Sequence, residues 1–143
     1  MTHTVSHRAV IAGVGKWLPS HVLTSNDVES RAQLRERLTL PGGIIEAMSG
    51  IRERRHIQDG EDSSDLAARA AAIAMTNAGI EASDLDVVVF AAATHDLSEP
   101  ATANILQSKI GAKNAHVFDV KNACNSFLNG LDVLDALIRA GRC

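Results

Sequence analysis

The sequence contains few aromatic residues: it has three Phe, one Trp and no Tyr. Alanine, in contrast, is abundant, above all in residues 67–74. Small side chains let helices approach a sheet or one another closely. The composition therefore favours a layered α/β core over an aromatic-rich β-sandwich.

Long apolar runs are also missing. The longest ones, such as residues 87–93, fall well short of the ~20 residues that a membrane-spanning helix needs. Lys16 interrupts the apolar run at residues 9–15, so we expect no export signal. With 143 residues, 45% of them apolar, the chain is long enough for one domain with a real core.

Cysteine is scarce, and Cys124 and Cys143 lie far apart. No CxxC motif or Cys/His ligand spacing occurs, so neither a disulfide framework nor a zinc site is expected, and no metal or organic prosthetic group is indicated. A reducing cytoplasm is the expected location. The net charge is −3, and Glu53 interrupts the basic cluster at residues 52–56, so nucleic-acid binding has no support.

The hydrophobic pattern alternates between strand-like and helix-like segments without internal repeats, which is typical of a βαβ progression. The segment at residues 86–93 is apolar on both faces, as in a parallel strand covered by helices on both sides. Strands are expected at residues 9–14, 51–57, 86–93 and 115–120, and helices at residues 25–38, 41–50, 66–78, 101–110 and from 126 onward.

The last of these helices has apolar residues on most of its circumference. Phe127, Leu131, Leu134 and Ile138 follow helical spacing, and further apolar residues fill the adjacent rows. Such a helix should be buried. We expect it to be covered by something outside this sequence, either a second half-chain or a partner subunit.

Cys124 stands where the strand-like run at residues 115–120 gives way to this helix. A helix beginning just after Cys124 would aim unsatisfied backbone N–H groups at the sulfur and favour the thiolate. The same N–H groups can hold the oxyanion that forms when a thiolate attacks a thioester. The alternative is a buried structural cysteine, because Cys is among the residues most often found in protein cores.

Several segments, in order, resemble one known family. They are residues 11–19, residues 49–55, residues 64–67, residues 100–111 and residues 118–124. Together they are similar to the N-terminal half of a β-ketoacyl-acyl-carrier-protein synthase III, a thiolase-like condensing enzyme. The resemblance implies an α/β fold in which residues 1–143 form the half that carries the nucleophilic Cys. Its mainly parallel sheet would be covered by helices on both faces, as part of a layered αβαβα enzyme whose C-terminal half is absent from this sequence.

The resemblance also implies a ping-pong reaction. Cys124 would take an acyl group from a thioester, and its backbone N–H would contribute to the oxyanion hole. A malonyl-carrier thioester would then lose CO₂ and attack the acyl-Cys, giving a β-ketoacyl product. The family's decarboxylating His and Asn belong to the C-terminal half. The six histidines of this sequence, which lie outside the matching motifs, are expected on the surface or in loops: His3, His7, His21, His56, His95 and His116.

Some positions depart from the family pattern. Ile44 and Met48 stand where a Trp and an Arg hold coenzyme A, so the stacking indole and the guanidinium are missing. Glu99 replaces the Phe that reaches the acyl channel of the dimer mate, and Asn122 and Ser126 replace Ala and Gly beside the nucleophile. Of these, Ile44, Met48, Glu99 and Asn122 are the candidate substrate-binding residues, and the departures indicate a specialised, secondary-metabolism-like member.

Two alternatives remain open. The acyl group on Cys124 could pass to an alcohol or amine, which would make the protein an acyltransferase, or the chain could be a non-catalytic partner of an active homologue. By resemblance, the partners are acyl carrier protein, acyl thioesters and a second copy in a homodimer, with no nucleic acid and no membrane.

Overall fold

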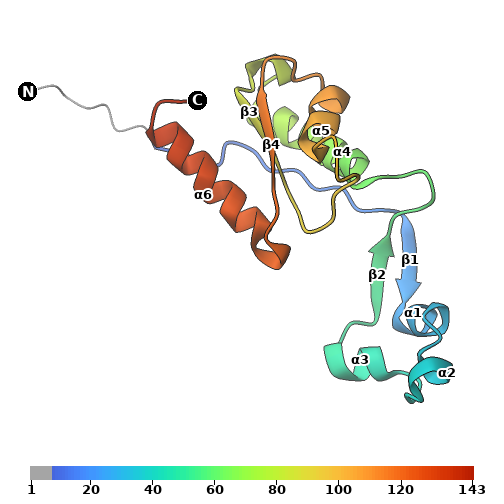
Figure 1. Cartoon of the computed structure of the whole chain (residues 1–143). Helices are drawn as coiled ribbons and strands as arrows, with labels where there is room; N and C mark the ends of the chain where they lie inside the picture. Colours follow the sequence, from blue (N-terminus) through green and yellow to red (C-terminus); the bar gives the residue numbers. More distant parts are fainter. Residues whose placement is uncertain (1–7) are drawn as a thin grey trace, which may run out of the picture. The chain divides into compact units, whose positions relative to one another are not determined.

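The computed structural model describes residues 8–143, which divide into two compact units. The larger unit contains residues up to Trp17 together with Asp62–Cys143, and the smaller unit is Leu18–Glu61 (Figure 1). His3 and His7 lie outside the described residues. No helix in the described part of the chain is both long and apolar enough to cross a membrane.

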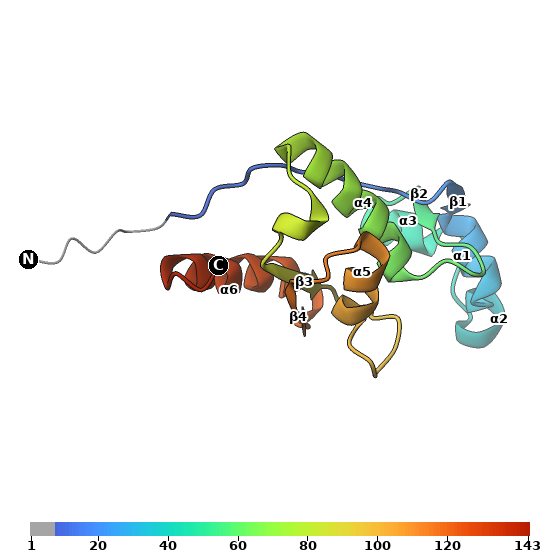
Figure 2. The same ribbon diagram turned by 90° about the horizontal axis from the view of Figure 1, so that it is seen from above.

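The centre of the larger unit is a pair of parallel strands, β3 (Val87–Ala91) and β4 (His116–Val120). Helix α5 (Thr102–Ile110) connects them, which gives the expected βαβ arrangement. Helices α4 (Ser63–Ala78) and α5 lie on one side of the strands and α6 (Ser126–Arg139) lies on the other (Figure 2). The predicted α/β class, with a parallel pair covered by helices on both faces, is confirmed.

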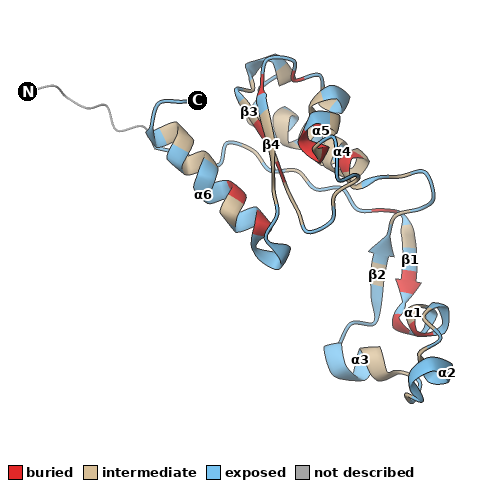
Figure 3. Cartoon of the chain, viewed as in Figure 1, coloured by how far each residue is buried: buried red, intermediate tan, exposed pale blue. Residues whose placement is uncertain are grey.

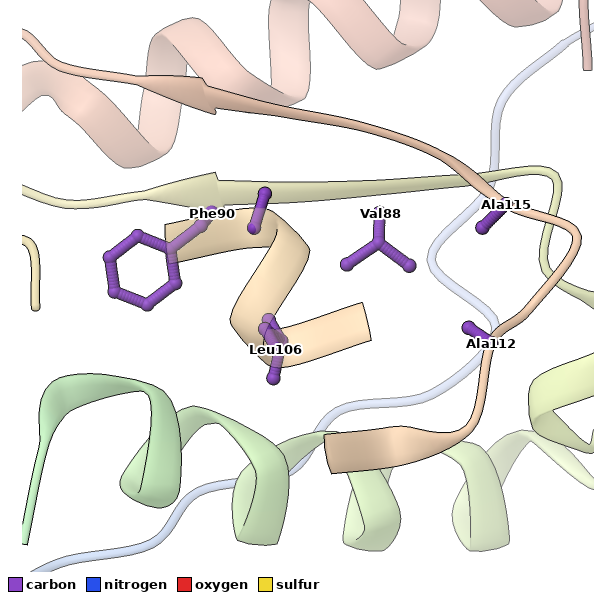
Figure 4. Packing of buried hydrophobic residues seen from close by; sticks show 6 residues of the cluster. Val88, Phe90, Leu106, Ala112 and Ala115 are labelled. Atoms are coloured by element: carbon purple, nitrogen blue, oxygen red, sulfur yellow. The ribbon is translucent and has the colours of Figure 1, made fainter. Parts of the chain in front are cut away.

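The hydrophobic core lies between the strands and α5. Val88 and Phe90 point from β3 toward this side, where Leu106 of α5 packs against them (Figure 4). The intervening β3 residues face α6, because Gly130 of α6 lies close to Val89 and Ala91. Helices on both sides of β3 explain why it is apolar at every position, with Val88 and Phe90 buried and the other three residues partly buried.

Helix α4 begins and ends as the sequence predicts. Asp62 and Asp65 form a reciprocal capping box at its N-terminus. Gly79 follows the helix with φ = 69°, a left-handed conformation that glycine adopts without a Cβ clash. The short 3₁₀ helix η1 (Ala82–Asp84) then leads into β3.

The predicted strand at residues 9–14 is wrong. This segment is not hydrogen-bonded into either sheet, and Val10 and Ile11 are 82% and 75% exposed. It runs along α4 instead (Figure 2). Asn77 of α4 donates a hydrogen bond of 2.9 Å to the Val14 carbonyl oxygen. An apolar run becomes a strand only where another strand pairs with it, and no strand of the described chain does so.

Two glycines allow this close approach to α4. A Cβ at Gly15 would overlap the Ala70 carbonyl oxygen and lie 2.6 Å from the Ala74 nitrogen. A Cβ at Gly13 would overlap the Ala74 carbonyl oxygen in the same way. The glycines therefore serve backbone-to-helix packing rather than a turn.

Helix α6 forms where the sequence predicts it, but its apolar side chains are not covered within residues 8–143. Phe127 is 65% exposed and Leu128 62%, and only Ser126 and Gly130 are buried (Figure 3). The expected burial of this helix is thus not provided by the described chain.

The smaller unit contains an antiparallel pair, β1 (His21–Thr24) and β2 (Glu53–His56), and three short helices. The single helix predicted over residues 25–38 is wrong: α1 (Ser25–Arg31) ends and α2 (Leu34–Leu38) begins on either side of Gln33, whose φ of 52° is left-handed. Helix α3 (Ile44–Ser49) is shorter than expected because glycines flank it on both sides.

Candidate active site

The candidate site lies at one edge of the parallel pair. The carboxyl ends of parallel strands lie at the same edge of a sheet, and ligands of open α/β sheets bind there. The chain leaving β3 forms the loop at residues 92–101, which carries Glu99, and the chain leaving β4 leads through residues 121–123 to Cys124. The Ala92 N–H donates to the Val120 carbonyl oxygen at 3.3 Å, so the two exits begin side by side.

Cys124 lies in a short 3₁₀ helix, η2 (Ala123–Asn125), and α6 begins two residues later at Ser126. The predicted position between a strand and a helix is confirmed. Cys124 is exposed and not in a disulfide, so it is not a core cysteine. Its sulfur is accessible to a reagent or substrate.

The residue before the nucleophile has an unusual backbone conformation. Ala123 has φ = 44°, in the left-handed region that costs an L-residue with a Cβ of the order of 1 kcal/mol. Within the described residues, no acceptor binds the backbone N–H groups of Ala123 and Cys124, whereas those of Asn122 and Asn125 are both bonded. A free N–H beside an exposed thiol is the donor that a developing oxyanion requires.

Asp119, near the end of β4, has a role that the sequence did not reveal. Its carboxylate accepts hydrogen bonds from the backbone N–H groups of Thr102 and Ala103, at 2.9 and 2.7 Å. These are the first N–H groups of α5, a helix whose N-cap residue, Ala101, supplies no side-chain cap. The carboxylate therefore caps α5 from the neighbouring strand. The sequence signal that could have indicated this role is an acidic residue between the apolar strand residues Phe118 and Val120.

His95 was predicted to be a surface or loop histidine. It does lie in the loop, but its side chain is only 12% exposed. Its Nδ1 lies 2.9 Å from an Asp119 carboxylate oxygen and its Nε2 lies 3.0 Å from the Ala92 carbonyl oxygen. The ring also packs edge-on against Phe90, with 5.4 Å between ring centroids. The contact with Asp119 joins the chain leaving β3 to the end of β4.

Asp96 fixes the same loop to two helices. Its backbone N–H donates to the buried hydroxyl of Thr102 at 3.0 Å, and its carboxylate accepts the Ser64 N–H of α4 at 3.1 Å. Asp96 thus anchors the loop at residues 92–101, which carries the exposed Glu99, to helices α4 and α5.

The start of α4 is also bound to α5. Lys109 donates hydrogen bonds to the Ser64 hydroxyl at 2.7 Å and to the Asp65 carboxylate at 2.5 Å. The bond from Lys109, together with the backbone N–H of Asp62, lowers the pKa of Asp65 below its ordinary value. The pair therefore favours the charged carboxylate at neutral pH.

The four candidate substrate-binding residues are divided between the units. Glu99 and Asn122 are exposed in the larger unit with Cys124. Ile44 and Met48 lie four residues apart on α3 of the smaller unit, where Met48 is 83% exposed. The buried Glu29 carboxylate holds this helix by accepting the Gly43 and Ile45 N–H groups, each at 2.7 Å.

Comparison with solved structures shows the class of protein to which this fold corresponds. OleA of Xanthomonas campestris, in one variant structure, superposes with a TM-score of 0.85 at 30% identity, over 98% of this chain and 42% of OleA. A 3-oxoacyl-(acyl carrier protein) synthase III of Xanthomonas oryzae gives 0.84 at 31% identity, over 94% of this chain and 40% of its own. The structure is that of the N-terminal part of thiolase-like condensing enzymes.

Comparison with curated sequences gives a consistent result. The chain is 40% identical over 136 residues to β-ketoacyl-[acyl-carrier-protein] synthase III of Rhodospirillum rubrum, and 34% identical over 135 residues to that of Anaplasma marginale. It is homologous to the N-terminal part of β-ketoacyl-acyl-carrier-protein synthase III, which confirms the predicted resemblance. The chain spans about 40% of the length of the curated relatives it matches. No model of a protein family matches it.

Proposed function

We propose that residues 1–143 are the nucleophile-bearing half of a condensing enzyme of the β-ketoacyl-acyl-carrier-protein synthase III type, with Cys124 as the acyl acceptor. The observation that carries the proposal is the turn at Cys124, where an exposed thiol and a free backbone N–H stand at the start of α6. Homology to the N-terminal part of the synthase supports the same assignment.

In the first half-reaction the Cys124 thiolate attacks the carbonyl carbon of an acyl thioester. A new C–S bond forms, and the carbonyl electron pair moves to oxygen, where the Cys124 N–H stabilises the negative charge. Collapse of this intermediate expels the thiolate of the donor. Helix α6 begins at Ser126, two residues after Cys124, and helix N-termini stabilise negative charge that develops beside them.

In the second half-reaction a malonyl-carrier thioester loses CO₂, and the electron pair left on its α-carbon attacks the acyl-Cys carbonyl. The β-ketoacyl product leaves on its carrier and the Cys124 thiolate is released. By family resemblance, the His and Asn that stabilise the enolate come from a second half. The uncovered apolar residues of α6, among them Phe127 and Leu128, fit a surface that this half or a second copy covers.

The departures at the candidate substrate positions suggest the donor. Ile44 and Met48 offer neither an aromatic face nor a guanidinium for a nucleotide, so we assign the donor as an acyl carrier protein rather than free coenzyme A. Glu99 and Asn122 would face the acyl group or its acceptor with polar atoms. The protein would act in a reducing compartment, where both thiols stay free. Faster acylation of Cys124 by an acyl-coenzyme A than by the matching acyl carrier protein would contradict the donor assignment.

The overall proposal is tested by a condensation assay with acyl-carrier and malonyl-carrier thioesters. The chain alone should form the acyl-enzyme, and β-ketoacyl product should appear only when the C-terminal part of a homologous synthase III is supplied. Full condensing activity from a single 15.2 kDa species would overturn the need for a second half.

The same assay separates the two alternatives. An acyltransferase would release an ester or amide when given an alcohol or amine, with no malonyl requirement. A non-catalytic partner would leave the activity of the full assembly unchanged in a Cys124→Ala variant, whereas the proposed role predicts a loss of at least about 10³-fold.

A further inference from the structure

The turn at Cys124 is held by side chains of the helix that follows it. We propose that Ser126, Asn122 and Asn129 form a polar clamp whose role is to orient the backbone N–H of Cys124 as an oxyanion donor. This inference rests on the proposed acylation of Cys124 and adds positioning residues to it. Ser126 and Asn129 do not act on substrate themselves.

Ser126 is the centre of the clamp. It is only 2% exposed, so its hydroxyl must find its partners within the protein. The hydroxyl accepts the Asn122 backbone N–H at 2.9 Å and donates to the Ala123 carbonyl oxygen at 2.8 Å. One hydroxyl therefore bonds both the N–H of the residue before Ala123 and the carbonyl of Ala123 itself. These two bonds maintain the left-handed conformation of Ala123.

The bond to the Ala123 carbonyl has a direct consequence for the nucleophile. The peptide unit that joins Ala123 to Cys124 is planar, and in a trans peptide the N–H points opposite to the C=O. Holding the carbonyl of Ala123 toward Ser126 therefore turns the Cys124 N–H away from Ser126. The Ser126 N–H also donates to this carbonyl, so the hydroxyl is the second of two restraints.

Asn122 and Asn129 connect the residues that precede the Cys124 turn to helix α6. The Asn122 side-chain nitrogen donates to the Asn129 carboxamide oxygen at 2.6 Å. Asn129 lies about one turn into the helix, so this bond ties the chain before the turn to the helix after it. Asn122 positions the turn through its side-chain nitrogen, while its side-chain carbonyl oxygen stays available to a substrate.

The clamp depends on residues that distinguish this chain. In the family that this chain resembles, Gly is common at the position of Ser126 and Ala at the position of Asn122. Neither Gly nor Ala has a polar side-chain atom. Family members with Gly and Ala at these positions therefore cannot form the side-chain hydrogen bonds that Ser126 and Asn122 form here. The clamp is a feature of this sequence rather than of the fold.

The test compares two reactions of the same sulfur, using the full chain with Cys143→Ser so that Cys124 is the only thiol. Acylation by an acyl-carrier thioester builds an oxyanion, whereas alkylation by iodoacetamide does not. Ser126→Ala should slow acylation about tenfold and change alkylation less than twofold. Asn129→Ala should slow acylation about threefold and serves as the second variant if Ser126→Ala does not fold. The control Ser108→Ala, at an exposed position on α5, should change neither rate.

Amide hydrogen exchange measures the clamp without any substrate. Ser126→Ala should accelerate exchange at the Asn122 amide at least tenfold, and Ser108→Ala should not. Unchanged exchange at Asn122 would overturn the clamp, as would acylation and alkylation rates that fall by the same factor or an acylation rate that does not fall. If the reference chain is not acylated at all, the proposed function fails, and the exchange result alone decides whether the clamp exists.

Discussion

An Asp119 carboxylate oxygen lies 2.9 Å from Nδ1 of His95, and this contact joins the two chain segments that leave the parallel strands. One segment carries Glu99 and the other carries Cys124. The same carboxylate also caps α5 through the Thr102 and Ala103 N–H groups. A single partly buried carboxylate thus connects the strand end, the loop and the helix around the candidate site.

Replacing this carboxylate should be costly. Asp119→Ala removes the acceptor of three hydrogen bonds and leaves the first N–H groups of α5 without a partner, so we expect a loss of about 2–4 kcal/mol in the free energy of unfolding. Urea unfolding followed by circular dichroism measures this. Asp132→Asn, at an exposed position on α6, is the control and should change stability by less than about 0.5 kcal/mol. A loss no larger than that of the control would show that Asp119 does not hold the site together.

Gly15 tests the packing of the N-terminal segment on α4. A Cβ at this position would overlap the Ala70 carbonyl oxygen, so Gly15→Ala should destabilise the chain by about 3 kcal/mol or detach the segment. Gly42→Ala is the matched control, because its Cβ would meet nothing closer than 3.5 Å. Thermal unfolding compares the two. Equal melting temperatures would mean that the segment is not packed on α4 in solution.

Asp65 gives the stability a pH dependence of defined sign. Because the folded state lowers the pKa of Asp65, its charged form contributes stability above the unfolded pKa of about 3.9, and this contribution disappears as the pH falls through the lower folded value. The native chain should exceed Asp65→Asn in stability at pH 6 by less than about 1 kcal/mol, since the pair with Lys109 is partly exposed. The difference should shrink below about pH 4. A difference that grows with acidification would contradict the assignment.

Ala123 tests the backbone strain beside the nucleophile. Glycine tolerates φ = 44°, so Ala123→Gly should relieve about 1–2 kcal/mol of strain while adding about 0.4–1 kcal/mol of unfolded-state entropy. The expected net effect is a stabilisation of about 0.5–1 kcal/mol by chemical denaturation. Ala136→Gly, exposed within α6, should instead cost about 1 kcal/mol. Two changes of the same sign would mean that Ala123 is not strained.

The sequence predicts those features that depend on neighbouring residues. Capping residues and Gly79 define α4, continuous apolar character defines β3, and helical spacing defines α6. Features that depend on distant partners were missed or wrong. The strand at residues 9–14 failed because no strand of the described chain pairs with it. The Asp119–His95 contact joins residues 24 positions apart, which no local pattern encodes.

The same distinction between local and distant determinants applies to the candidate site. The sequence alone locates the junction at Cys124, because a strand pattern and a helix pattern meet there. The left-handed Ala123 and the two bonds of Ser126 were not visible, since both depend on the path of the backbone through the turn. The break at Gln33 belongs to the same group, because a left-handed non-glycine residue leaves no sequence signal.

The central claim is that Cys124 accepts an acyl group, and peptide mapping after exposure to an acyl-carrier thioester tests it most directly. The account predicts one acyl adduct, on the peptide containing Cys124, that forms equally in the Cys143→Ser chain and disappears in Cys124→Ser. An adduct confined to Cys143, or no adduct even when the C-terminal part of a homologous synthase is supplied, would contradict it.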